Sequence, residues 1–113
     1  MAVNSKKKGK TGELEVANYL KKRGLNARRT QQYSGTEGTS DVICEEWPDT
    51  HIEVKRNETL NVEKALQQAI RDSEGKTPIV IHRKNNEKWK VTMQLDDFIN
   101  LKNLYLSDIG KDV

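Results

Sequence analysis

The 113-residue sequence predicts an α/β (α+β) fold, in which a central mixed β-sheet is flanked by helices in the order α-β-β-β-α-β-β-α. Three segments repeat apolar residues at helical spacing, and short alternating or continuous apolar runs lie between them. Two of the strand segments are joined by a short turn, as in an antiparallel hairpin, whereas another strand follows a helix. Antiparallel and parallel neighbours together give a mixed sheet.

The chain opens with a lysine-rich segment, residues 1–8, which we expect to be a disordered basic arm. A helix begins at Thr11 or Gly12, because apolar residues then recur every three or four positions. This helix ends at Arg23, since the following Gly24 is a typical stop signal.

The central strands follow this helix. Residues 25–30 form a short strand, and the polar segment 31–40 contains two glycines and is predicted to be a loop. Asp41–Cys44 is the next strand, 45–49 is a turn that contains a proline, and Thr50–Arg56 alternates as a further strand. The last two strands therefore form a hairpin.

The second half of the chain supplies the remaining elements. A second helix spans Val62 to about Ser73 and is ended by Gly75. The continuous apolar run 79–81 suits a buried strand, and 89–93 alternates as another. The last helix runs from Leu95 to about Tyr105.

A chain of this length fits one domain, which we place at residues 9–106, between the arm and a C-terminal tail at 107–113. The net charge is +3, and the first 29 residues carry nine of the 20 basic side chains with only two acids. A basic front end is typical of a phosphate-binding surface, although a solubilising tail explains the lysines equally well. The single cysteine excludes an intramolecular disulfide and a cysteine zinc site. With no signal peptide or membrane span, a cytoplasmic location is expected.

The candidate catalytic residues lie in the hairpin. Side chains alternate along a strand, so Glu53 and Lys55 share one face while Ile52 and Val54 occupy the other. Folding the hairpin brings Asp41 opposite Glu53. Two carboxylates and an ammonium group would then meet at one end of the sheet.

This set suits metal-dependent hydrolysis of a phosphodiester. Two carboxylates offer a hard divalent cation, usually Mg²⁺, the oxygen ligands that it prefers. Such a cation binds the phosphate and lowers the pKa of a bound water, and Lys55 can stabilise charge on the phosphate. The alternative is a solvated strand face, since Glu-x-Lys is a common pair.

Asp41 followed by Ile52-Glu53-Val54-Lys55 resembles the motif of the PD-(D/E)XK nuclease superfamily. The stretch from Lys8 to Glu15 and the one from Leu20 to Leu25 resemble the opening helix of archaeal-type Holliday junction resolvases. The resemblance implies a restriction-endonuclease-like core and DNA cleavage. Ser40 stands where the superfamily's name places a proline.

The resemblance also implies site roles. The spacing from Gly9 to Glu13 matches the one that leads to a metal-site glutamate on the first helix of the family. The structural alternative is a glutamate that is favoured near a helix N-terminus by the helix dipole. Glu15 is the second candidate for the metal-site glutamate. We therefore expect Glu13, Asp41, Glu53 and Lys55 to be catalytic. The expected ligands of Mg²⁺, or of Mn²⁺ as its substitute, are Glu13, Asp41, Glu53 and the backbone carbonyl of Val54.

Other residues are candidates for binding or support. Gln68 on the second helix is a possible accessory residue, and both His51 and His82 are interpreted as structural or surface residues. Phosphate contacts position a duplex without reading its sequence, and basic or hydroxyl side chains near the site suit them. The candidates for DNA binding are Lys6, Lys7, Lys8, Lys10, Arg28, Arg29, Ser34 and Arg56.

The sequence thus favours a Mg²⁺-dependent endonuclease acting on DNA, with branched or linear duplex left open. The alternatives are a non-catalytic nucleic-acid-binding module on the same fold and a restriction-like or nicking nuclease. Symmetric cutting of two strands needs two sites, so a homodimer is expected. The last helix is apolar on more than one face and is the candidate interface, against the alternative of a helix buried on one side only.

Overall fold

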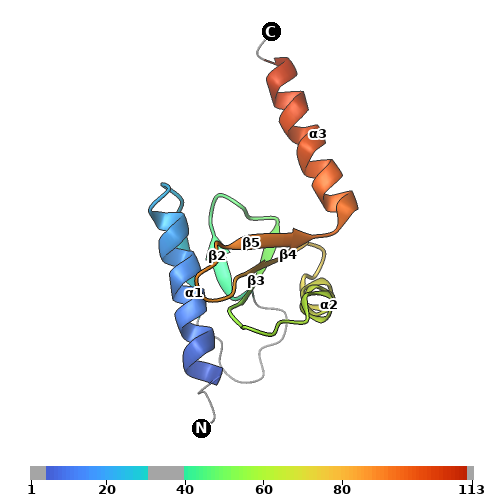
Figure 1. The fold of residues 1–113 in the computed structure, drawn as a ribbon. Helices are drawn as coiled ribbons and strands as arrows, with labels where there is room; N and C mark the ends of the chain where they lie inside the picture. Colours follow the sequence, from blue (N-terminus) through green and yellow to red (C-terminus); the bar gives the residue numbers. More distant parts are fainter. Residues whose placement is uncertain (1–4, 31–39, 112–113) are drawn as a thin grey trace.

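The computed structural model describes residues 5–30 and 40–111, and it contains the predicted elements in the predicted order (Figure 1). The predicted mixed α+β fold is therefore confirmed. Its elements are α1 (Ser5–Lys21), β1 (Ala27–Arg29), β2 (Val42–Cys44), β3 (Thr50–Lys55), α2 (Val62–Asp72), β4 (Thr77–His82), β5 (Lys90–Met93) and α3 (Leu95–Lys111).

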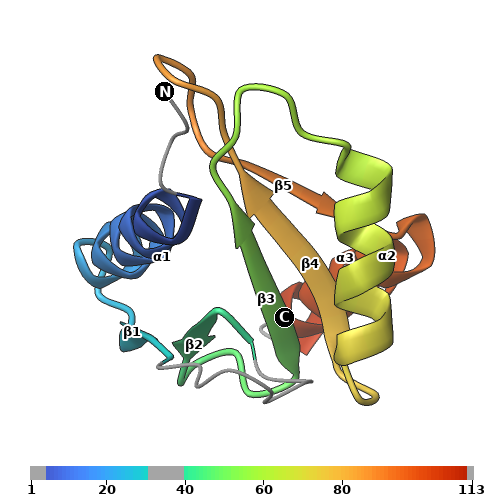
Figure 2. The same ribbon diagram turned by 90° about the horizontal axis from the view of Figure 1, so that it is seen from below.

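The five strands form one sheet in the order β1-β2-β3-β4-β5. Neighbours are antiparallel except β3 and β4, which are parallel because α2 carries the chain from the end of one strand back to the start of the next. Helix α1 covers one face of the sheet and α2 the other (Figure 2).

The main core lies under α1. Val16 and Leu20 of this helix pack against Ile52 and Val54 of β3. Helix and strand approach closely at Gly12, where an added Cβ would lie 3.1 Å from the Cβ of Arg56. The smaller core under α2 consists of Ala65, Ala69 and Val80.

Two helix ends differ from the prediction. Helix α1 begins at Ser5, so residues 5–8, expected in a disordered arm, have helical backbone. The lysines there are good helix formers and no proline interrupts them. Helix α3 likewise continues to Lys111, through most of the segment expected to be a tail, where no proline interrupts it. The predicted loop lies almost entirely outside the described residues.

Helix α3 leaves the end of β5 and points away from the sheet (Figure 1). None of its described residues is buried, although it carries eight large apolar side chains. Over the described part of the chain, no helix has the length and apolarity that a membrane span requires.

Candidate active site

Asp41 and Glu53 meet where β2 joins β3. The register that pairs Val42 with Ile52 also brings Asp41 to Glu53, and the N–H of Asp41 donates to the carbonyl of Ile52 at 2.8 Å. Oδ2 of Asp41 accepts the N–H of Val54 at 2.8 Å. Both carboxylates are buried, with exposures of 9% for Asp41 and 3% for Glu53. The hairpin therefore brings the two acids together, as the alternation of β3 predicts.

Glu13 approaches the same place from α1. Its Oε2 lies 3.1 Å from Nε of Arg29 on β1, and only 15% of its side chain is exposed. Its negative charge is one of the causes that raise the pKa of Asp41. The close approach of α1 to β3 at Gly12 places this turn of the helix over the strand.

The surroundings of Asp41 raise its pKa, so they disfavour its ionised form. The pKa of this carboxyl is raised from 3.8 to about 7, first by burial and then by the neighbouring charges of Glu53 and Glu13. The hydrogen bond from the N–H of Val54 acts in the opposite direction. Carboxylates crowded in this way favour either a proton or a cation among them.

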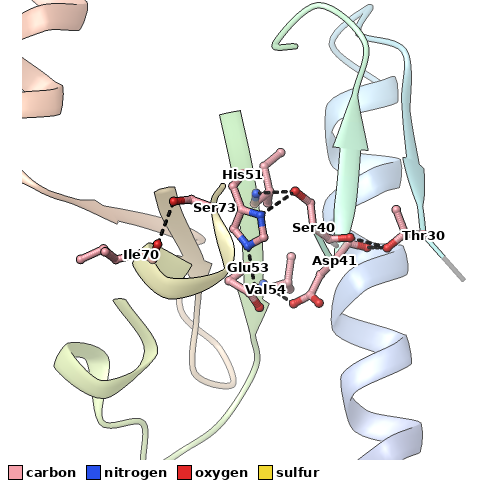
Figure 3. A network of polar contacts seen from close by, with 9 residues as sticks. Thr30, Ser40, Asp41, His51, Glu53, Val54, Ile70 and Ser73 are labelled. Atoms are coloured by element: carbon pink, nitrogen blue, oxygen red, sulfur yellow. Dashed lines mark hydrogen bonds and ion pairs between the residues drawn. The ribbon is translucent and has the colours of Figure 1, made fainter. Parts of the chain in front are cut away.

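His51 also lies at the site, although no role for it there was predicted from the sequence. Its Nε2 lies 2.7 Å from Oε1 of Glu53, and its Nδ1 lies 3.1 Å from Oγ of Ser40 (Figure 3). The side chain is 1% exposed, which excludes the surface alternative and leaves the structural one of the two that the sequence offered. The available signal was its position two residues before Glu53, on the same face of the strand.

Thr30 supports the backbone that carries Asp41. Its hydroxyl donates to the carbonyl of Asp41 at 3.0 Å and also contacts the carbonyl of Ser40. This buried threonine follows β1 directly and was not among the sequence candidates.

Lys55 lies at the end of β3, half-buried, on the same side of the strand as Glu53. It makes no ion pair within residues 5–30 and 40–111. Its ammonium group is therefore not neutralised by a described carboxylate and can face a phosphate.

Glu15 has other partners. Oε1 of Glu15 lies 3.3 Å from Nε of Arg56, and Oε2 lies 2.8 Å from an Nη nitrogen of Arg83. Two guanidinium groups thus hold this carboxylate, which makes Glu15 a structural bridge between α1 and the strand ends. Arg56, a DNA-binding candidate, uses its guanidinium group to pair with Glu15 in that bridge.

The remaining candidates are more dispersed. Lys10 is exposed on α1, and Arg28 is exposed on β1, 3.6 Å from Glu45. Gln68 is half-buried on α2, on the side of the helix that carries Ala65 and Ala69. The side chains of Lys6, Lys7 and Lys8, and all of Ser34, lie outside the described residues.

The donor chemistry of the site fits a hard divalent cation, because Asp41 and Glu53 are neighbouring buried carboxylates and the charge of Glu13 also acts on Asp41. In the described structure, however, no three His, Cys, Asp or Glu side chains are arranged as a metal cluster. Oxygens of Glu13 and Glu53 are turned to Arg29 and His51 instead.

Known proteins resemble this chain in family and in fold. A family model described as "Phage putative PDDEXK endonuclease" matches residues 4–108. The solved structure of Archaeoglobus fulgidus Hjc, described as a Holliday junction resolvase from an archaeal hyperthermophile, is similar in fold, with a TM-score of 0.59. The two chains are 18% identical, and the match covers 75% of this chain and 76% of that one. No curated protein compared with the chain matches it.

Proposed function

The chain belongs to the phage PDDEXK endonuclease family whose model it matches, and from that premise we propose that it is a metal-dependent endodeoxyribonuclease that hydrolyses phosphodiester bonds. The family match confirms the resemblance to the PD-(D/E)XK superfamily, whose members include nucleases of this type. The observation that carries the proposal is the meeting of Asp41 and Glu53, with Glu13 near enough to raise the pKa of Asp41 and with Lys55 on the same side of β3 as Glu53.

The proposed metal ligands are the carboxylates of Glu13, Asp41 and Glu53 with the backbone carbonyl of Val54. Mg²⁺ is the proposed cofactor and Mn²⁺ its substitute; when bound, the cation supplies a water of lowered pKa and charge for the phosphate. Burial of Asp41 and Glu53 keeps both carboxylates in a low dielectric, where they act strongly on any bound charge.

Lys55 completes the proposed catalytic set. Its ammonium group shares a side of β3 with Glu53, which suits a contact with the scissile phosphate or with the attacking water. Ile52 and Val54 on the other side of the strand are buried under α1, so they hold the catalytic face rigidly.

DNA is the proposed substrate, and its backbone would be held by Lys6, Lys7, Lys8, Lys10, Arg28, Arg29, Ser34 and Arg56. Lys10 and Arg28 are exposed and support this role, whereas Arg29 and Arg56 also bind Glu13 and Glu15. Gln68 is proposed as an accessory polar group. The proposed compartment is the cytoplasm, where DNA is available and Cys44 needs no oxidising environment.

Branched DNA is the preferred substrate in this proposal, because the fold resembles that of a protein described as a Holliday junction resolvase. The alternatives remain nicking or restriction-like cutting of linear duplex, and DNA binding without cleavage. A cleavage assay with Mg²⁺ or Mn²⁺ on four-way junction, flap, linear duplex and single strand separates them. Cleavage that EDTA abolishes supports the proposal, and binding without cleavage on every substrate contradicts it.

A homodimer through α3 is part of the proposal. Leu101 and Leu104 line a groove of about 560 Å³ that α3 forms with α1 and the sheet. The opposite side of the helix carries a second apolar stripe, and its members are exposed: Leu95, Phe98, Ile99, Tyr105, Leu106 and Ile109. The helix also carries Asp96, Asp97 and Asp108, which disfavour DNA as the occupant, whereas the exposed apolar stripe suits a second copy of this chain.

A further inference from the structure

His51 is the most deeply buried polar side chain at the site, and it bridges the strands that carry the two acids. Its ring contacts Glu53, two residues along β3, and Ser40, the residue that precedes Asp41. Each carboxylate is therefore connected by hydrogen bonds to a residue that adjoins the other acid in the sequence. Asp41 accepts from Val54, which follows Glu53, while Glu53 is linked through His51 to Ser40.

The hydrogen bonds have a consistent direction. The N–H of Ile52 donates to Oγ of Ser40 at 3.3 Å, so this hydroxyl acts as an acceptor there and keeps its own proton to donate. Ser40 can donate that proton to Nδ1 of His51 in the tautomer that carries its hydrogen on Nε2. Nε2–H then donates to Oε1 of Glu53 at 2.7 Å.

We infer that His51 is a positioning residue, which fixes the carboxylate of Glu53 for a divalent cation through the chain Ser40–His51–Glu53. This inference rests on the proposed function and adds a residue to it. The contact of His51 with Oε1 restrains the carboxylate of Glu53 in one orientation before a metal arrives. Such outer hydrogen bonds orient metal ligands and raise affinity.

Substitution of His51 by glutamine or by asparagine can separate its two contacts, because each amide can retain only one of them. The amide of His51→Gln can place a donor near the position of Nε2 and retain the bond to Glu53. The shorter side chain of His51→Asn can offer an acceptor near Nδ1 for Ser40, but it cannot reach Glu53. The dissociation constant of Mn²⁺, measured calorimetrically on the protein without DNA, reports the effect independently of cleavage.

We expect His51→Asn to weaken Mn²⁺ binding by about tenfold or more, in the range known for losing an outer hydrogen bond to a metal ligand. We expect His51→Gln to stay within about threefold of the wild type, since it keeps the bond to the ligand. Cleavage rates measured at subsaturating Mn²⁺ should follow the same order.

Ser40→Ala provides a second and milder test, because it removes the hydroxyl that orients the ring. Its matched control is Ser73→Ala, which removes another poorly exposed hydroxyl, donated to the carbonyl of Ile70 at 2.8 Å on α2. We expect weaker Mn²⁺ binding in Ser40→Ala and unchanged binding in Ser73→Ala. If His51→Asn does not fold, this pair decides.

A histidine with only a structural role would lower the melting temperature of its variants and leave the Mn²⁺ affinity of the folded protein unchanged. Wild-type affinity in folded His51→Asn, or in Ser40→Ala where His51→Asn does not fold, therefore overturns the inference alone. A wild-type protein that neither binds Mn²⁺ nor cleaves DNA overturns the proposed function and this inference with it.

Discussion

The N–H of Val54 donates to Oδ2 of Asp41 at 2.8 Å, so the residue next to one acid holds the carboxylate of the other. An asparagine at position 41 can accept the same hydrogen bond through its amide oxygen. The charge of Asp41 can therefore be removed without removing the contact that places it.

Asp41→Asn tests the metal site on this basis. We expect cleavage to fall by at least about 100-fold, on the scale of losing one electrostatic contact to the transition state, while DNA binding is retained or improved. A cleavage assay beside a binding titration with Ca²⁺ measures both. Cutting at the wild-type rate would remove Asp41 from the catalytic set.

The raised pKa of Asp41 predicts how the stability of the metal-free protein depends on pH. Since the pKa is about 7 when folded and near 3.8 when unfolded, the folded state binds more protons between these values. The contribution of Asp41 to the free energy of unfolding therefore falls as pH rises from 4 to 7, by up to about 4 kcal/mol. Denaturant unfolding in EDTA should show Asp41→Asn gaining stability over the wild type across this range. A difference that does not change with pH would contradict the assignment.

Two glycines of α1 form a matched pair. Gly9 has no neighbouring atom within 4 Å of an added Cβ, so Gly9→Ala should stabilise the helix by about 0.5–1 kcal/mol. At Gly12 a Cβ would meet the Cβ of Arg56 at 3.1 Å, and Gly12→Val should cost about 1–3 kcal/mol by overpacking. Chemical denaturation measures both. Equal effects at the two positions would show that α1 does not approach β3 closely.

The lysines near the start of α1 should contribute to DNA affinity through phosphate contacts. Replacing Lys6, Lys7 and Lys8 with glutamine keeps good helix formers and removes three charges. The log–log slope of affinity against salt should then fall by up to about 2.7, and Lys102→Gln on α3 should leave it unchanged. A slope that the triple variant does not alter would make these lysines a solubilising segment.

Self-association should depend on the exposed stripe of α3. We expect a dimer at micromolar concentration, and dissociation when Ile99 and Leu106 are replaced with glutamate, because charges on an apolar contact are costly to bury. Ser107→Glu adds a charge at an exposed position about 100° around the helix from Leu106 and should leave the dimer intact. Sedimentation velocity distinguishes the species, and a wild-type monomer both alone and on DNA would favour a nicking enzyme.

The sequence predicted the meeting of Asp41 and Glu53 because a strand has a period of two and a hairpin has a defined partner. The same alternation placed His51 beside Glu53, but its role depends on the hydroxyl of Ser40, whose side-chain direction has no sequence signal. The pairing of Glu15 with Arg83 joins residues 68 positions apart, which local patterns cannot reveal. Helix ends were misplaced at Ser5 and Lys111 because neither end carries a strong stop signal.

The connectivity of the sheet determines the order in which the three carboxylates come together during folding. Strands β2 and β3 are joined by a short turn, so the pairing of Val42 with Ile52 closes a short loop at little entropic cost and brings Asp41 to Glu53. Glu13 reaches these two acids only after α1 has docked on the sheet. A nascent or partly unfolded chain therefore lacks an assembled carboxylate set, and any nuclease activity arises with the last stage of folding.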